Sequence, residues 1–524
     1  QNRLRGIFAG NVNRRIGIGA HIDYLHSKGC YENQAAKNFN FGLSFYYLGD
    51  RYEGQAFFNH FNTTIKANGG ITDDLYILDP AQLQGGDDKI EAKSIPTRLS
   101  AAQNRLNGSQ FYMNHAYKIG FWEDEQVNDT LTRKKYVPVT KIIYSMDFKS
   151  GHHEFKNRNG EQGREFWQEA YFNADRTDDN TRYWTLSNTV GISMVEGFRK
   201  WAKFAIAAYA TYEHRHYEQA DPEKYVASES EHELTPMPEG LFPPVAKSHL
   251  IWVGGRISKQ KGTAIRYNAD AKFGLLGAVT GDIDINGDIS TRFRMLGDTV
   301  SIRAYGWFKN SATTYLLQKY ISNHFIWNNS FGKTRSFRVG GELVIPWTKT
   351  KLRAGVENLQ NYVYFDESSK PAQYGGNVQV FSATLDQKLR FGIWNWNNTI
   401  TYQTSSNSDV IPLPALSIYS NMFLHFRAFR VLDLQIGIDC DWYSRYYGLQ
   451  LQPATMTFHT QKDVKVGNYA FCNAYVTARL YKVRFYVLWS HVNQGLFSKD
   501  YFSMPHYPVN PRRLMLGVSV DFAD

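Results

Sequence analysis

Residues 431–443, Val-Leu-Asp-Leu-Gln-Ile-Gly-Ile-Asp-Cys-Asp-Trp-Tyr, decide the fold of this chain. Ile436 and Ile438 fall on one side of an extended chain, whereas Gln435 and Asp439 fall on the other. A period of two residues predicts a β-strand that has one apolar and one polar face.

The same alternation recurs at 483–489 and at 514–522. A soluble β-sandwich hides its apolar faces inside and seldom repeats this pattern along a whole long chain. A barrel in lipid turns the apolar face outward and the polar face toward a wet interior. We therefore expect an all-β fold, a transmembrane antiparallel up-and-down β-barrel of a bacterial outer membrane.

Composition agrees with this expectation. Aromatic residues make up 15% of the 524 residues, which is too many for a disordered chain and suits aromatic rings at two membrane interfaces. Mean hydropathy is −0.46, and no window approaches the apolar run that a membrane helix requires. We expect residues 1–524 to form one barrel domain, with an N-terminal piece missing before Gln1.

Charge and cysteine content exclude several other classes. The formal charge is +10, but the Lys and Arg residues are dispersed among apolar ones, so no nucleic-acid partner is expected. Cys30, Cys440 and Cys472 lack the spacing of a disulfide scaffold or a zinc site. The latter two are interpreted as small apolar residues on strand faces, and we expect no metal or cofactor.

Short turns and long connections alternate along the chain. Strands are expected at 4–10, 16–24, 39–47, 52–58, 110–121, 137–149, 183–195, 201–214, 248–258, 263–274, 281–293, 300–310, 331–345, 350–362, 378–391, 396–404, 415–427, 431–444, 469–481, 482–492 and 511–522. Long connections are expected at 62–109, 150–182, 215–247, 311–330, 445–468 and 493–510. Outer-membrane barrels have short periplasmic turns, long extracellular loops and usually an even strand number, which gives about 20–22 strands.

The last third of the chain resembles the putative-porin family of Bacteroidota outer membranes. The matching segments are Leu413–Leu416, Asp441–Tyr443 with Tyr446-Tyr447, Gln452–Thr455, Lys465–Tyr469, Ser490–Gly495 and Tyr501–Pro508, with Asn68–Asp74 near the N-terminus. One departure is Thr455–Phe458, where a Gly is expected before the aromatic residue. The resemblance implies a barrel and a passive channel, and it brings no catalytic residues.

The interior is the natural place for function. Candidate pore-lining residues on the polar strand faces are Lys141, Asp147, Arg266, Asp270, Lys272, Asp282, Asp284, Asp288, Arg303, Arg338, Glu342, Asp433, Asp439 and Arg484. Opposed basic and acidic walls would orient polar solutes and filter ions, and the net positive charge favours anions. Alternatively, these charges neutralise one another across a plugged interior.

The connection at 62–109 is a candidate constriction. Folded inward, its carboxylates would narrow the pore with negative charge, whereas the alternative is a mobile surface loop. The residues concerned are Asp73, Asp74, Asp79, Asp87 and Asp88.

Other motifs favour structural roles. His152-His153-Glu154 cannot easily share one metal ion, because neighbours on a strand face apart. Ser490-His491 has no nucleophile elbow around it, so an enzyme is not expected. The glycine pairs at 254–255 and 340–341 indicate bends or close strand contacts. Rim aromatics at 442–447 fit a membrane belt better than sugar stacking.

Two functions remain open from the sequence. The first is a porin-like channel for passive diffusion of small polar solutes. The second is an accessory barrel of a protein-insertion or protein-secretion complex, with other outer-membrane proteins or lipoproteins as partners. In both cases membrane lipid and lipopolysaccharide are expected neighbours.

Overall fold

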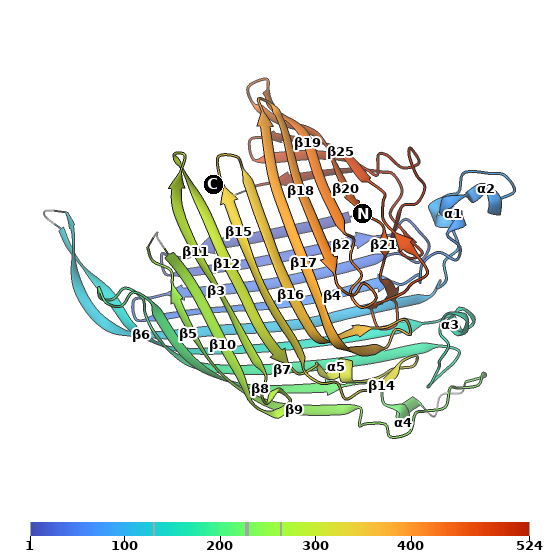
Figure 1. Cartoon of the computed structure of the whole chain (residues 1–524), viewed down its shortest axis with the longest axis horizontal. Coiled ribbons are helices and arrows are strands. Elements are labelled where there is room, and N and C mark those ends of the chain that lie inside the picture. Colours follow the sequence, from blue (N-terminus) through green and yellow to red (C-terminus); the bar gives the residue numbers. More distant parts are fainter. Residues whose placement is uncertain (1, 129–130, 226–229, 263–264, 523–524) are drawn as a thin grey trace.

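A computed structural model describes residues 2–128, 131–225, 230–262 and 265–522. Its main feature is a 21-stranded antiparallel sheet in which each strand pairs with the next one along the chain (Figure 1). The strands are β1 (Asn2–Asn11), β2 (Ile16–Ser27), β3 (Ala36–Leu48), β4 (Tyr52–Lys66), β5 (Ala102–Asn128), β6 (Leu131–Asn157), β7 (Thr177–Met194), β8 (Ala205–Glu218), β9 (Val245–Lys259), β10 (Ile265–Leu276), β11 (Ile283–Met295), β12 (Asp298–Ser311), β15 (Thr334–Ile345), β16 (Thr350–Phe365), β17 (Pro371–Phe391), β18 (Trp394–Ser405), β19 (Leu416–Ala428), β20 (Leu432–Tyr443), β25 (Phe471–Leu480), β26 (Val483–Ser490) and β29 (Arg513–Val520).

The remaining elements are short and lie in the connections between these strands. They are α1 (Leu75–Leu78), α2 (Pro80–Leu83), η1 (Ala92–Ser94), α3 (Gly160–Phe166), α4 (Pro222–Tyr225), η2 (Gly277–Val279), α5 (Tyr315–Gln318), β13 (Lys319–Ile321), β14 (Ile326–Asn328), β21 (Tyr446–Tyr447), β22 (Gln450–Gln452), β23 (Thr457–His459), β24 (Lys465–Val466), β27 (Phe502–Met504) and β28 (Tyr507–Pro508). No described helix has the length and apolar character needed to cross a membrane.

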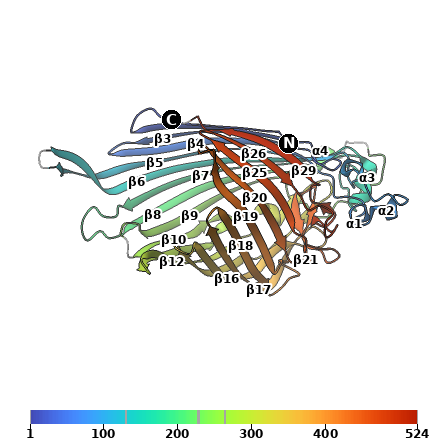
Figure 2. The same ribbon diagram turned by 90° about the horizontal axis from the view of Figure 1, so that it is seen from above.

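The predicted alternation sets the two faces of the sheet. Ile436 on β20 lies opposite Leu424 on β19 and Val476 on β25, and all three side chains are exposed on the apolar face. Asp439 lies on the other face, where its carboxylate accepts a hydrogen bond from the Asn473 amide at 2.8 Å. The sheet curves into a barrel (Figure 2). Its two faces carry the apolar and polar residues that the sequence predicts for the lipid side and the interior.

The two rims of the barrel differ as expected. At one rim, short turns join neighbouring strands, such as the two-residue turn 296–297 and the three-residue turn 429–431. Leu296, Gly297, Phe429 and Arg430 in these turns have the positive φ that tight hairpin turns require. At the other rim most connections are long and folded. The β5–β6 hairpin departs from this pattern, because beyond Lys118 and Val139 its described residues form β-pairs only with each other. It projects past the short-turn rim (Figure 1).

Several strands are longer than the alternation predicts. The connections expected at 62–109 and 150–182 are only 67–101 and 158–176, because β4, β5 and β6 continue toward the long-loop rim. Apolar alternation marks only the part of a strand that faces lipid, whereas hydrogen bonding between strands continues beyond it. The prediction that Asp282 is a pore-lining residue on a strand is also wrong. Strand β11 begins only at Ile283, and the buried Asp282 carboxylate contacts Lys333 at 2.8 Å.

The first and last strands are not joined to each other among the described residues. Twenty antiparallel steps separate β1 from β29, so these two strands run in the same direction. The loops next to these strands nevertheless contact each other. The Tyr31 hydroxyl, in the β2–β3 loop, donates to the Val509 carbonyl, in the β26–β29 loop, at 3.0 Å. The strand count lies within the expected range, and an additional partner strand for β1 stays a prediction.

One sequence interpretation is wrong. Cys440 and Cys472 lie directly opposite each other on β20 and β25 and form a disulfide. Their separation of 32 residues hides this pairing in the sequence, because it becomes visible only when the register of the two strands is known. Cys30 is a free thiol.

Candidate channel wall and mouth

Ion pairs between neighbouring strands cover much of the inner face. Arg303 on β12 contacts Asp288 on β11 at 3.2 Å, and Arg256 on β9 contacts Asp270 on β10 at the same distance. Further pairs between adjacent strands on this face are Lys309–Asp284, Arg338–Glu357, Lys351–Glu342 and Arg353–Asp386. Lys141 on β6 contacts Glu53 on β4, and Lys149 contacts Asp147 within β6. The charges are thus paired along the wall, within a strand or between strands that lie close together.

The other candidate wall residues make different contacts. Lys272 lies over the Trp252 ring at 3.9 Å, and the Arg266 guanidinium donates to the Gly262 carbonyl at 3.0 Å. Asp433 contacts His425 at 2.7 Å. Arg484 lies opposite Arg479 on β25 and is exposed. Among the described residues, no carboxylate lies within 4.0 Å of Arg479 or Arg484, so the inner face has unpaired cationic positions on β25 and β26.

Tyrosines lie over glycines on this same face. A Cβ on Gly340 of β15 would come within 2.6 Å of the Tyr305 ring on β12. A Cβ on Gly254 of β9 would likewise come within 2.4 Å of the Tyr209 ring on β8. One glycine of each pair singled out in the sequence therefore lies where a ring from the next strand crosses the backbone, which agrees with the predicted close strand contact.

Several of the wall charges are accessible to solvent. The side chains of Arg256, Arg303 and Lys309 are 57%, 48% and 47% exposed although they face the inside of the barrel. An ion pair exposed to this degree keeps much of its hydration and contributes little to stability. These charges therefore give the interior its polarity more than they hold the strands together.

The candidate constriction residues are divided among several surroundings. The Asp74 carboxylate contacts His506 at 3.0 Å, whereas Asp88 contacts Lys499 at 2.6 Å. Asp73 accepts a hydrogen bond from the Leu75 amide at the start of α1. Figure 1 places α1 and α2 beyond the strand ends, away from the barrel wall. The role of Asp73, Asp74, Asp79, Asp87 and Asp88 as a constriction stays a prediction.

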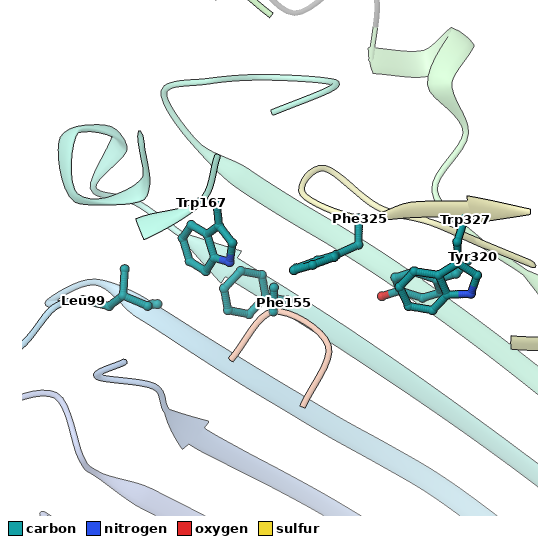
Figure 3. Close-up of a cluster of buried hydrophobic side chains, with 8 residues drawn as sticks. Leu99, Phe155, Trp167, Tyr320, Phe325 and Trp327 are labelled. Carbon is teal, nitrogen blue, oxygen red and sulfur yellow. The ribbon is translucent and has the colours of Figure 1, made fainter. Parts of the chain in front are cut away.

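Loops from distant strands meet over the mouth. The cluster in Figure 3 combines Phe155 from the inner face of β6 with Trp167 from the β6–β7 loop and with Tyr320, Phe325 and Trp327 from the β12–β15 loop. Leu99 and Ala454 add the β4–β5 and β20–β25 loops to the same cluster. These loops start at well-separated positions around the sheet, so they meet only by crossing the mouth.

Two further clusters complete this loop layer. One joins Tyr31, Ile71 and Val466 with Tyr501 and Phe502, and so links four loops. The other joins Phe172, Phe242 and Ile321, from three loops. Burial of this much apolar side chain in each cluster stabilises the layer over the long-loop rim.

A single turn fastens the β12–β15 loop in this layer. The Asn323 amide oxygen accepts hydrogen bonds from the backbone amides of Phe172 and Asn173, and its nitrogen donates to the Asn173 carbonyl and the Thr177 hydroxyl, all at 2.8–3.2 Å. Its backbone amide donates to Asp179 at 2.8 Å. We call Asn323, His324 and these partners the mouth latch.

His324 is held neutral within the mouth latch. Its ring is stacked on Trp167 with centroids 4.2 Å apart, and Nδ1 donates to the Glu169 carbonyl at 2.8 Å. Nε2 then accepts from the Thr177 hydroxyl at 2.7 Å. Burial lowers the pKa of His324 to about 4, and the hydrogen bond to the Glu169 carbonyl offsets only part of that effect.

The sequence does not single out the mouth latch. The sequence does contain a signal that this loop is packed. Tyr320, Phe325 and Trp327 together would expose more apolar surface than an unpacked loop of this length normally does. Alternation could not reveal their role, since these residues lie outside the long strands.

The remaining motifs take structural positions. His153 is half-buried on the inner face and contacts the Asn104 side-chain amide oxygen at 2.7 Å, whereas His152 faces outward toward Asn180. Buried His491 contacts the Tyr469 hydroxyl and the Asn510 carbonyl. No described group of three His, Cys, Asp or Glu side chains is placed to hold a metal ion.

The rim aromatics divide between two surroundings. The Tyr443 and Tyr446 rings pack edge to face at 6.0 Å, and the Tyr443 hydroxyl donates to the Phe502 carbonyl. Tyr447 is exposed, and Lys465 lies over its ring at 4.7 Å. Tyr443 and Tyr446 are therefore part of the loop layer.

A family model described as putative porin matches residues 1–524. The chain belongs to the putative porin family. A search of curated protein sequences gives no match.

Solved outer-membrane receptors share the fold of this putative porin. The ferric enterobactin receptor of Pseudomonas aeruginosa is 9% identical with a TM-score of 0.64, over 99% of this chain and 78% of the receptor. The siderophore receptor PirA of Acinetobacter baumannii is 10% identical with a TM-score of 0.64, over 99% and 77%. At this identity the likeness concerns the fold alone. With the family match it places the protein in the outer membrane.

Proposed function

We propose that this putative porin is a non-enzymatic channel through which small polar solutes diffuse passively across the outer membrane, with access controlled by the loop layer. The observation that carries the proposal is the hydrated inner wall. Its arginines and lysines are about half exposed while facing the interior. Charged side chains in that state indicate a water-filled passage.

The loop layer gives the channel a closed state. Three apolar clusters and the mouth latch join loops that start far apart on the rim. Opening requires that the β12–β15 loop leaves its site. The net positive charge of +10 and the unpaired Arg484 region favour anionic solutes.

Uptake into liposomes tests this proposal. The purified full chain is reconstituted, and swelling is measured with neutral sugars of increasing size and with small anions. The proposal expects uptake that does not saturate, falls with solute size and rises in Asn323→Ala. Asn329→Ala is the matched control, because the Asn329 side chain makes one long hydrogen bond, at 3.5 Å to Leu317. Impermeable liposomes with folded Asn323→Ala protein would contradict the proposal.

The projecting β5–β6 hairpin favours a second candidate, an accessory barrel within an envelope complex. Near its end, an acidic run at 123–125 on β5 pairs across the ladder with a basic run at 133–135 on β6. The tip also contacts the neighbouring turn, where Arg199 lies over the Phe121 ring at 4.8 Å. A charged hairpin that projects at the short-turn rim suits a protein partner in the periplasm. A stoichiometric complex that dissociates on deletion of the tip, together with a non-conducting barrel, would favour this candidate.

A further inference from the structure

A hollow on the outer face of strands β2 to β6 has no role in solute passage. Its volume is about 560 Å³, and its lining residues are Tyr24, Lys37, Phe39, Asn62, Thr64, Gln103, Arg105, Glu154 and Lys156. The register of the sheet places them on the outer side. Tyr24 pairs with Phe39, and both continue the alternation of exposed Ile22 and Leu43 on the lipid-facing side.

The hollow lies where the outer face changes from apolar to polar. On β5, outward residues run from Tyr117 through Phe111 to Ser109 and then to Arg105 toward the long-loop rim. The outward residues of the neighbouring strand β6 show the same change toward the long-loop rim, from Ile142 through Phe148 to polar residues. Because the long loops of such barrels lie outside the cell, this boundary lies at the headgroups of the outer leaflet.

Charge in the hollow is positive and partly uncompensated. The only carboxylate in its lining, Glu154, contacts Lys156 at 2.5 Å. Lys37 and Arg105 have no carboxylate within 4.0 Å among the described residues; Lys37 lies over the Tyr24 ring at 5.9 Å, and Arg105 donates to Asn62 at 3.2 Å. Lys37 on β3 and Arg105 on β5 lie in register on either side of Thr64 of β4. An ammonium and a guanidinium group that flank one hollow and have no carboxylate partner in the described part of the chain suit a phosphate.

The rest of the lining suits a sugar. Asn62, Thr64 and Gln103 offer amide and hydroxyl groups for hydrogen bonds to hydroxyls, and Tyr24 and Phe39 offer aromatic surface to a pyranose ring. Below these residues the outer face is apolar, which suits acyl chains. We propose that this hollow binds the phosphorylated sugar headgroup of one outer-leaflet glycolipid, with Lys37 and Arg105 contacting the phosphate.

Binding of phosphorylated lipid A to the purified full chain in detergent tests this assignment by native mass spectrometry. The double variant Lys37→Gln/Arg105→Gln is expected to bind about tenfold more weakly, since charge-assisted hydrogen bonds to phosphate are lost. Lys247→Gln is the matched control, because Lys247 is an exposed cation on the outward side of β9, remote from the hollow. Its affinity for lipid A is expected to equal that of the unmodified protein.

The arms of the experiment distinguish the sources of phosphate. Lipid A with its phosphates removed is expected to bind as weakly as the double variant binds intact lipid A. Equal binding of phosphatidylglycerol, or displacement of lipid A by an equal concentration of inorganic phosphate, would overturn the glycolipid assignment. So would unchanged affinity in the double variant, once its heat-modifiable gel mobility shows a folded barrel.

Discussion

At the scale of single residues, the inner wall depends on tyrosines that cover glycines of the next strand. Tyr305 lies where a side chain on Gly340 would be, and the neighbouring Gly341 has nothing nearer to its Cβ position than 3.7 Å. The two adjacent glycines therefore differ in their tolerance to substitution, because a Cβ on Gly340 would overlap a ring, whereas a Cβ on Gly341 would be at ordinary contact distance from its nearest neighbour.

Gly340→Ala is expected to lower the free energy of unfolding by about 1–3 kcal/mol through overpacking against Tyr305. Gly341→Ala should cost much less. Urea titration of the barrel in micelles, followed by tryptophan fluorescence, measures both. Combining Gly340→Ala with Tyr305→Ala should remove most of the penalty; a double variant as unstable as the sum of its parts would contradict this contact.

His324 gives the mouth latch a pH dependence. Its pKa in the folded loop is about 4, below the ordinary value of about 6.5 in an unfolded chain. The latch therefore has its full stability above about pH 6.5, loses stability as the pH falls toward 4, and changes little further below that.

Limited proteolysis of the β12–β15 loop across this pH range measures the effect. Cleavage by a protease active in acid is expected to accelerate between pH 6.5 and 4 in the unmodified protein. His324→Gln should show a nearly flat profile, because glutamine does not titrate. The same acceleration in both proteins would assign the pH dependence to other groups.

At the scale of elements, alternation predicts the strands well but fails at their ends. The 21 strands of the sheet match the expected segments, because lipid imposes an apolar residue at every second position. Beyond the lipid, β5 and β6 keep pairing while their outer residues become polar, as at Arg105 and His152. A sequence pattern based on apolar residues cannot detect that continuation.

The same limit explains what was missed about the candidate site. Polar positions such as Asp439 and Arg303 are placed on the inner face by periodicity alone, whereas their ion-pair partners depend on register. The Cys440–Cys472 disulfide depends on register too. The mouth latch depends on loop packing, for which Asn323 carries no periodic signal.

Cysteine accessibility tests the assignment of faces. Single cysteines at Gln435 and Asp439, in a Cys30→Ser background, are expected to react with a membrane-impermeant maleimide through the interior. Cysteines at Ile436 and Ile438 should react only with a lipid-soluble reagent, because these side chains face the apolar side. Mass spectrometry of the reconstituted protein measures the extent of labelling at each cysteine. Equal labelling at all four positions would contradict the assignment of the two faces.

At the scale of the whole molecule, one chain combines a hydrated wall with a closed loop layer. The wall charges are paired between neighbouring strands, which leaves the centre of the barrel free of salt bridges reaching across it among the described residues. The loop layer, by contrast, joins opposite parts of the long-loop rim. A channel that is closed by its loops follows from these two features together.

Single-channel conductance in planar bilayers tests this central claim most directly. The account predicts discrete current steps from the purified full chain, with the fraction of time spent open higher in Asn323→Ala than in the unmodified protein or in Asn329→Ala. Silent bilayers from all three folded proteins would contradict it and would instead favour the accessory barrel.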